Sequence, residues 1–230
     1  MKTGIPHSVP PSKPIHLKAV ISVTKWLTVF LFPLFMSIDC NGQIKSLDSL
    51  DATDSGPGNK KAGVKFESGI EYLTPTHNNR SIQTVTANLF VGREFFEKIR
   101  FSVYGGVTTT YAWGTIVQWD DNFNNITYHN NAAGIGPAFQ VRFEPFVYNR
   151  FSFSPDFGGG LIFYSSKFPH GGDIYNFMWR MGGAIHYRVN STYGVNLTSK
   201  WLHVSNGQGL GAHNPSYEAW GVGVAFVKYL

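Results

Sequence analysis

Charged residues are scarce in this chain of 230 residues. Asp, Glu, Lys and Arg together make up 14% of it, whereas a soluble globular domain carries about 25%. The apolar run from Trp26 to Ile38 is interrupted by Pro33 and is too short for a membrane-spanning helix, which needs roughly 20 apolar residues. The composition therefore argues against an ordinary soluble domain, and the length of this run argues against a spanning helix.

Cysteine is nearly absent: Cys40 is the only one, so no disulfide can form within the chain. The net charge is +5, but the chain has no basic run or recognisable nucleic-acid motif, so no nucleic-acid partner is predicted. A positive chain is compatible with an anionic lipid surface. Aromatic residues (16%) and 25 glycines are abundant, which favours a β-rich protein in a membrane.

The N-terminal region has the features of a secretory signal. A charged segment precedes the apolar run from Trp26 to Ile38, and small residues follow it in the stretch "DCNGQ". This order is typical of an exported protein. We therefore expect residues 1–42 to be a signal peptide, with cleavage after Gly42 and a mature chain that begins at Gln43.

Two alternatives stay open for this region. Cys40 could carry a lipid, although Asp39 stands where a lipobox requires a small neutral residue. The apolar run could also be a buried core helix. Residues 43–61 are polar and rich in Gly, Pro and Ser, so they are predicted to form a flexible leader.

From residue 62 onward, apolar residues alternate with small or charged ones, which is the pattern of half-buried strands. Eight segments show it: 63–72, 84–94, 101–113, 135–144, 151–163, 177–187, 194–205 and 217–229. The connections alternate between short ones (96–99, 147–150 and 189–192) and long polar ones (74–81, 117–131, 165–176 and 206–215). Outer-membrane barrels have short periplasmic turns and long extracellular loops in this way.

The distribution of charge indicates which face of the strands is the interior. A soluble barrel has an apolar interior, but here charged residues alternate with the aromatic ones, among Gly, Ala and Ser. These are Lys65, Glu67, Glu71, Arg142, Glu144, Arg180, His186 and Lys200. Small and paired charged residues suit the narrow interior of an eight-stranded barrel. We predict an all-β fold, an eight-stranded antiparallel transmembrane β-barrel of the outer-membrane type over residues 62–230; a soluble β-barrel or sandwich is the alternative.

The last two segments contain the three residue types of a nucleophilic triad. His203, Ser205 and Glu218 fall on the outward, lipid-facing side of their strands, beside the last long loop. If Ser205 pairs with Ser216 across the hairpin, His203 faces Glu218, and opposed residues have Cβ atoms about 4.5–5.5 Å apart. Such an arrangement gives a hydroxyl, a base and an orienting carboxylate.

These residues also have a non-catalytic interpretation. A His-x-Ser pair on a strand is often accidental, but polar groups that face lipid are costly unless they pair, which favours a functional role. Trp201 and Trp220 lie on the same face and could line an acyl groove or simply belong to an aromatic girdle. The loop histidines His77, His129, His170 and His213 have no metal-ligand spacing, so neither a metal nor another cofactor is expected.

The stretch "HVSN", the Gly/Asn/Pro-rich loop after it and the Glu on the last strand resemble the PagL-type lipid A 3-O-deacylases. The resemblance covers about the last thirty residues. It implies that Ser205 is the nucleophile, His203 the base and Glu218 the orienting acid. It also makes Asn206 a candidate oxyanion or positioning residue.

The expected function is therefore an outer-membrane esterase that hydrolyses a 3-O-linked acyl ester of lipid A, with a C-terminal catalytic hairpin. Its partners would be lipopolysaccharide, as substrate, and the outer membrane; a homodimer stays open. Two alternatives remain: a non-catalytic barrel with a structural or adhesive role, and a lipid A acyltransferase, which would pass the acyl group to another acceptor.

Overall fold

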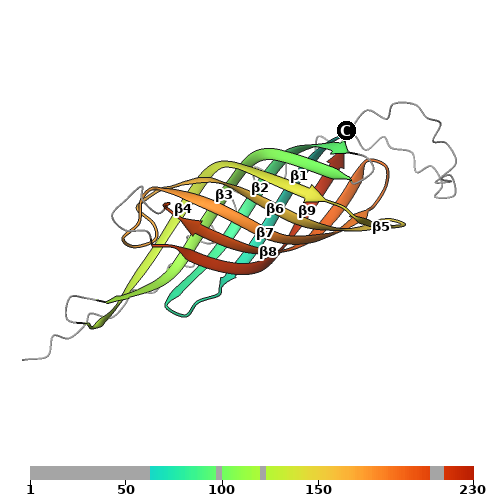
Figure 1. Cartoon of the computed structure of the whole chain (residues 1–230). Helices are drawn as coiled ribbons and strands as arrows, with labels where there is room; N and C mark the ends of the chain where they lie inside the picture. The colour runs from blue at the N-terminus through green and yellow to red at the C-terminus, as the bar shows by residue number, and fades with distance from the viewer. Residues whose placement is uncertain (1–62, 97–99, 120–122, 208–214) are drawn as a thin grey trace, which may run out of the picture. The chain divides into compact units, whose positions relative to one another are not determined.

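Antiparallel strands make up most of the described chain (Figure 1). The computed structural model describes residues 63–96, 100–119, 123–207 and 215–230. The predicted signal peptide (1–42) and leader (43–61) lie outside these residues. The strands are β1 (Val64–Pro75), β2 (Arg80–Phe96), β3 (Phe101–Trp119), β4 (Asn125–Phe143), β5 (Phe146–Tyr148), β6 (Phe151–Tyr164), β7 (Tyr175–Arg188), β8 (Tyr193–Ser205) and β9 (Tyr217–Tyr229).

The strands close into a barrel. Their order is β4-β3-β2-β1-β9-β8-β7-β6-β5, and a further pairing of β4 with β6 joins the two ends of the sheet. Closure also makes the first and last strands neighbours, since β1 pairs with β9. The three-residue β5 pairs with the start of β6 and only lengthens that connection. The eight long strands therefore form a closed antiparallel barrel, as predicted from the alternation.

Two predicted long loops are wrong in their length. The loop expected over residues 74–81 shrinks to 76–79, because β1 continues to Pro75 and β2 begins at Arg80. Residues 117–131 were expected to form a long polar loop, but β3 continues to Trp119 and β4 begins at Asn125, with Val117 paired to Thr127. Figure 1 shows this hairpin reaching beyond the neighbouring strands. The backbone hydrogen bonds of a ladder do not depend on apolar side chains, so polar residues can extend a hairpin into water. The lack of alternation indicated only that neither face is apolar.

The connection between β4 and β6 contains a short strand that was not predicted. The turn assigned to residues 147–150 shrinks to Asn149 and Arg150, because Val147 and Tyr148 belong to β5. Asn149 has a φ of 52°. Asparagine adopts this left-handed conformation more readily than most residues, which explains how so short a turn is made.

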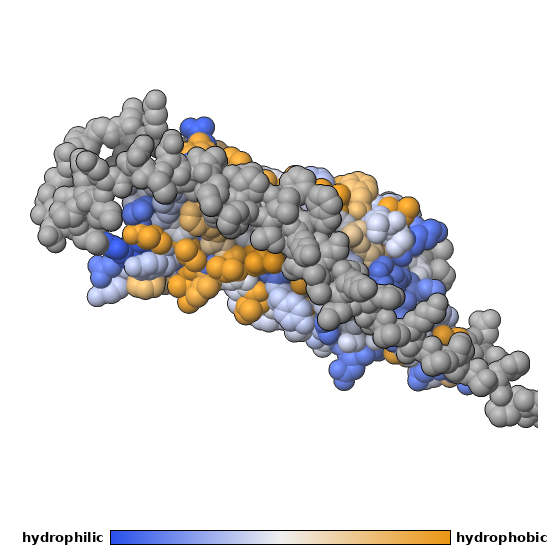
Figure 2. All heavy atoms as spheres, turned by 180° about the vertical axis from the view of Figure 1, so that it is seen from behind, coloured by the Kyte–Doolittle hydropathy of each residue, from blue (hydrophilic) through white to orange (hydrophobic). Residues whose placement is uncertain are grey.

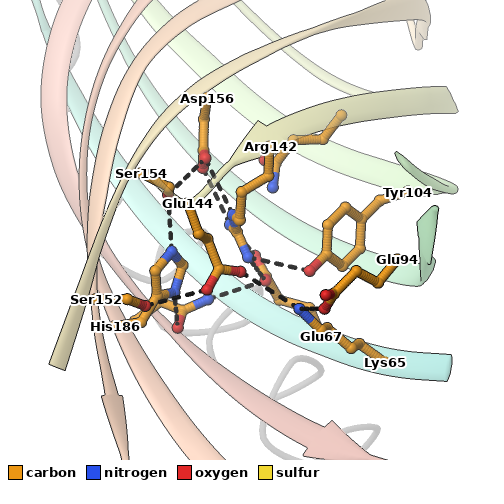
Figure 3. A network of polar contacts seen from close by, with 12 residues as sticks. Lys65, Glu67, Glu94, Tyr104, Arg142, Glu144, Ser152, Ser154, Asp156 and His186 are labelled. Atoms are coloured by element: carbon orange, nitrogen blue, oxygen red, sulfur yellow. Dashed lines mark hydrogen bonds and ion pairs between the residues drawn. The ribbon is translucent and has the colours of Figure 1, made fainter. Parts of the chain in front are cut away.

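The interior of the barrel holds the predicted charged face. Arg142 is 1% exposed and contacts two carboxylates: its Nη1 lies 2.6 Å from Glu67 Oε2, and its Nη2 lies 3.0 Å from Asp156 Oδ2. Glu71 lies between two further cations, 3.1 Å from Arg180 and 3.3 Å from Lys200. Figure 3 shows the Arg142 group, with strands far apart in sequence contributing to one network. The charges are thus buried but paired, as an interior of this kind requires.

Nearer the long loops the interior becomes apolar. A buried cluster there includes Leu73, Ile82, Ile116, Ile162, Phe168, Met178, Leu202, Val204 and Tyr217. The Tyr217 and Tyr164 hydroxyls lie 2.7 Å apart within it. Since successive side chains of a strand point to opposite faces, burying Val204 and Tyr217 turns the alternate residues of β8 and β9 toward the outer wall.

The outer wall is apolar. Large hydrophobic side chains are 40–64% exposed around it, among them Ile70, Leu89, Val91, Val107, Ile135, Phe139, Phe157, Trp179, Met181, Leu197, Val222 and Val224. Figure 2 shows apolar side chains lying next to one another over one face of the wall. A soluble monomer seldom exposes so large a continuous apolar surface. Within the described residues, no helix has the length and hydropathy to cross a membrane.

The closed ladder leads to a first prediction. Because each long strand is paired along both edges, we expect the purified protein in detergent to stay folded in cold SDS and to unfold only on heating. The unheated and heated samples should therefore migrate differently on a gel, and circular dichroism should be of the β type. A compact fold that is readily soluble without detergent would contradict the apolar exterior.

Candidate active site

The hairpin of β8 and β9 brings His203 opposite Glu218. The neighbouring pairs of the ladder fix this register. Val204 pairs with Tyr217 on one side of His203 and Glu218, and both of these side chains are buried in the interior. Trp201 pairs with Trp220 on the other side. His203 Nδ1 lies 3.2 Å from Glu218 Oε1, and the two side chains are 27% and 30% exposed. The facing pair expected from the sequence is therefore present on the outer wall.

This contact defines the chemistry available to the imidazole. An ionised carboxylate can only accept hydrogen bonds, so the Nδ1 of His203 donates to Glu218. The lone pair of the neutral ring is then on Nε2. That is the tautomer in which a histidine can accept a proton from a hydroxyl group.

Ser205 lies two residues further along the same strand, at its end. Its backbone pairs with Phe177 of β7, and the residue is 9% exposed. Within the described residues, no hydrogen bond joins the Ser205 hydroxyl to His203. Catalytic hydrogen bonds are often long without substrate and tighten when it binds. The structure thus brings the base and the acid together and leaves the predicted nucleophile adjacent to them.

Asn206, the predicted oxyanion or positioning residue, is 1% exposed. Its side-chain Nδ2 donates to Asp173 Oδ2 at 3.4 Å, in the connection between β6 and β7. Gly207 follows with a φ of 80°, a conformation that glycine adopts without strain. Asn206 therefore ties the end of β8 to the neighbouring connection at the point where the chain turns.

The two tryptophans lie beside the histidine on the outer wall. The Trp201 ring stacks on that of His203, with centroids 5.8 Å apart. Trp220 is 51% exposed, and its Nε1 donates to Ser199 Oγ at 3.1 Å. Both indoles therefore place apolar surface near His203 on the outer wall.

His77 was expected to be an ordinary loop residue, but it also contacts Glu218. Its Nε2 lies 3.1 Å from Glu218 Oε2, although the two are 141 positions apart in the chain. The pairing of Pro75 with Ala219 brings the end of β1 next to the start of β9. The contact of His77 with Glu218 could have been predicted only from barrel closure together with this register of β1 and β9.

A small cavity of about 230 Å³ opens beside Glu218 and is lined by His77, Asn79, Arg80, Tyr217 and Glu218. A larger cavity of about 520 Å³ lies at the short-turn end of the barrel, lined in part by Lys65, Glu144, His186 and Tyr229. The larger one is remote from His203, so size alone does not locate the site.

Another serine–histidine pair lies in the interior. Ser154 Oγ is 2.7 Å from His186 Nε2, and His186 Nδ1 is 2.5 Å from Asn196 Oδ1. Ser154 is completely buried, and its hydroxyl also lies 2.9 Å from Asp156 Oδ1 (Figure 3). A lipid ester cannot reach a serine enclosed in this way, so the pair belongs to the interior network. Across the residues with described positions, no group of three or more His, Cys, Asp or Glu could hold a metal ion.

The similarity of this chain to known proteins is structural. No protein-family model matches the chain, and no curated protein sequence does. Among solved structures, the chain is similar to the "Crystal structure of the outer membrane enzyme PagL", with 15% sequence identity and a TM-score of 0.47. The similarity covers 69% of this chain and 97% of that one. The fold assignment rests on the strand pairing described above.

Proposed function

We propose that this chain is an outer-membrane esterase that hydrolyses a 3-O-linked acyl ester of lipid A. The observation that carries the proposal is the His203–Glu218 pair on the apolar outer wall, two residues from Ser205. Polar groups on such a wall carry a desolvation cost that pairing offsets only in part, and apolar side chains would avoid this cost, so the pair supports a functional role. A soluble substrate would be expected in a polar cleft, whereas a lipid substrate meets this wall directly.

The closure and the outer surface of the barrel support a membrane location. A closed barrel leaves no unpaired strand edge, which is a condition for crossing a bilayer with strands. The exposed aliphatic and aromatic side chains would contact lipid, and the paired charges would lie inside. Export across the inner membrane would depend on the signal peptide proposed for residues 1–42.

The proposed reaction begins with attack on the ester. The Ser205 oxygen bonds to the ester carbonyl carbon while His203 Nε2 takes the hydroxyl proton, and Glu218 stabilises the resulting imidazolium. When the intermediate collapses, the bond to the sugar oxygen breaks, and His203 returns the proton to that oxygen. Water then attacks the acyl-serine in the same way and releases the fatty acid.

The negative oxygen formed in each step needs hydrogen-bond donors. Asn206 or a backbone N–H of the adjacent loop is our candidate, because Asn206 directly follows the nucleophile. Loss of one such donor typically lowers the rate about 10²–10³-fold. Trp201 and Trp220 would contact the acyl chain.

The test is to incubate the purified barrel with lipid A in detergent and to follow the products by mass spectrometry. We expect lipid A to lose one acyl group and an equal amount of free 3-hydroxy fatty acid to appear. Transfer of the acyl group to a phospholipid would instead identify an acyltransferase. Lipid A that stays unchanged would favour the non-catalytic barrel.

A further inference from the structure

The carboxylate of Glu218 is contacted from two sides. Its Oε1 faces His203 Nδ1 at 3.2 Å, and its Oε2 faces His77 Nε2 at 3.1 Å. The two histidines come from different ends of the sequence, one from β8 and one from the loop between β1 and β2. Each oxygen of the carboxylate thus has its own imidazole partner.

The loop that carries His77 is held in place without this contact. The backbone N–H of Thr76 donates to the carbonyl of Glu218 at 3.2 Å. Arg80 Nη1 donates to the carbonyl oxygen of Ser216 at 2.9 Å and to its hydroxyl at 2.7 Å. These bonds already attach the loop to the beginning of β9. The specific effect of the His77 ring is therefore on the orientation of the carboxylate.

Glu218 needs such a restraint. Its side chain is 30% exposed, and a long exposed side chain keeps rotamer freedom that a single surface contact does not overcome. If Oε2 is fixed by His77, rotation that would take Oε1 away from His203 is opposed. His203 then keeps the proton on Nδ1 and the lone pair on Nε2.

We propose that His77 is a positioning residue, which holds the orienting acid Glu218 and thereby the base His203. This inference rests on the proposed esterase function. It adds a fourth member to the triad, contributed by the opposite end of the barrel sequence and joined to it by strand closure. Its side chain is 56% exposed, so it acts on the rate of reaction far more than on the stability of the fold.

The test compares His77→Phe, which removes the N–H donor and keeps a ring, with His77→Gln, which keeps an N–H donor. His129→Phe is the matched control, the same change at an exposed residue of β4. Two readouts are measured: kcat and KM for lipid A, and the rate at which a long-chain fluorophosphonate labels Ser205. In labelling, the serine oxygen bonds to phosphorus, fluoride leaves, and His203 takes the hydroxyl proton.

We expect His77→Phe to lower both kcat and the labelling rate about tenfold with KM unchanged, since small losses of alignment are costly for catalysis. His77→Gln should recover most of the rate, and His129→Phe should match the wild type. All three should keep the heat-dependent gel migration of the folded barrel, because exposed pairs add little stability.

The possible results separate the two proposals. If Ser205 is labelled at the same rate in the wild type and in His77→Phe, the role of His77 is overturned and the esterase stands. The role of His77 is also overturned if His77→Gln is as slow as His77→Phe, because the N–H donor then does not matter. If Ser205 of the wild type is not labelled at all, both proposals are overturned.

Discussion

Ser205→Ala and His203→Ala will each lower the release of 3-hydroxy fatty acid from lipid A by about 10⁴-fold or more. The first change removes the attacking oxygen, and the second removes the group that takes its proton, so either loss stops the same step. Members of a triad act as a unit, and removing one of the two central residues costs nearly as much as removing all three. The rates are measured by mass spectrometry on purified, folded variants.

Glu218→Ala should be impaired less severely, because the orienting acid can matter less than the nucleophile and the base. Ser68→Ala is the matched control, since Ser68 lies in β1 opposite Phe226, eight residues along β9 from Glu218. That variant should keep the wild-type rate. Wild-type deacylation by Ser205→Ala would refute the assignment and would favour the non-catalytic barrel.

Arg142→Met will lower the free energy of unfolding by about 3–5 kcal/mol, the usual cost of removing one partner of a buried ion pair. Arg142 is 1% exposed and makes ion pairs with both Glu67 and Asp156. Its guanidinium also lies over the Tyr104 ring, 5.1 Å from the centroid. Without it, the two carboxylates keep their burial and lose their main cation.

The measurement is a urea titration of the barrel in lipid vesicles or detergent. Arg188→Met is the control, because Arg188 is exposed and contacts the Tyr229 ring. This substitution should lower the free energy of unfolding by about 1 kcal/mol or less. Adding Glu67→Gln and Asp156→Asn to Arg142→Met should restore part of the lost stability, since the unpaired charges then disappear. If Arg142→Met is as stable as the wild type, the buried carboxylates do not need this cation, and the prediction is wrong.

The sequence was most informative where one rule determined the position of a side chain. Alternation with period two predicted that Glu71, Arg142 and Lys200 point inward, and the structure buries all three. The same alternation, with an antiparallel hairpin, predicted that His203 faces Glu218, which the strand register confirms. The catalytic roles of these residues stay predictions.

Other features depended on information that local patterns lack. Tyr104 is a large aromatic residue that fills the interior beside Arg142, although aromatic residues were taken as a mark of the outer face. The contact of His77 with Glu218 requires the register between the first and last strands, which follows only from closure. The length of the β3–β4 hairpin was missed because its polar residues do not alternate.

The interior network has a consequence for the permeability of the membrane that would hold this barrel. An eight-stranded barrel is just wide enough for side chains to fill it, and here Glu67, Glu71, Asp156, Arg142 and Lys200 meet across its axis, each at most 5% exposed. We expect such an interior to block the barrel and to carry no ion current. In a planar bilayer the protein should therefore be electrically silent, and many copies could accumulate without weakening the barrier to small solutes.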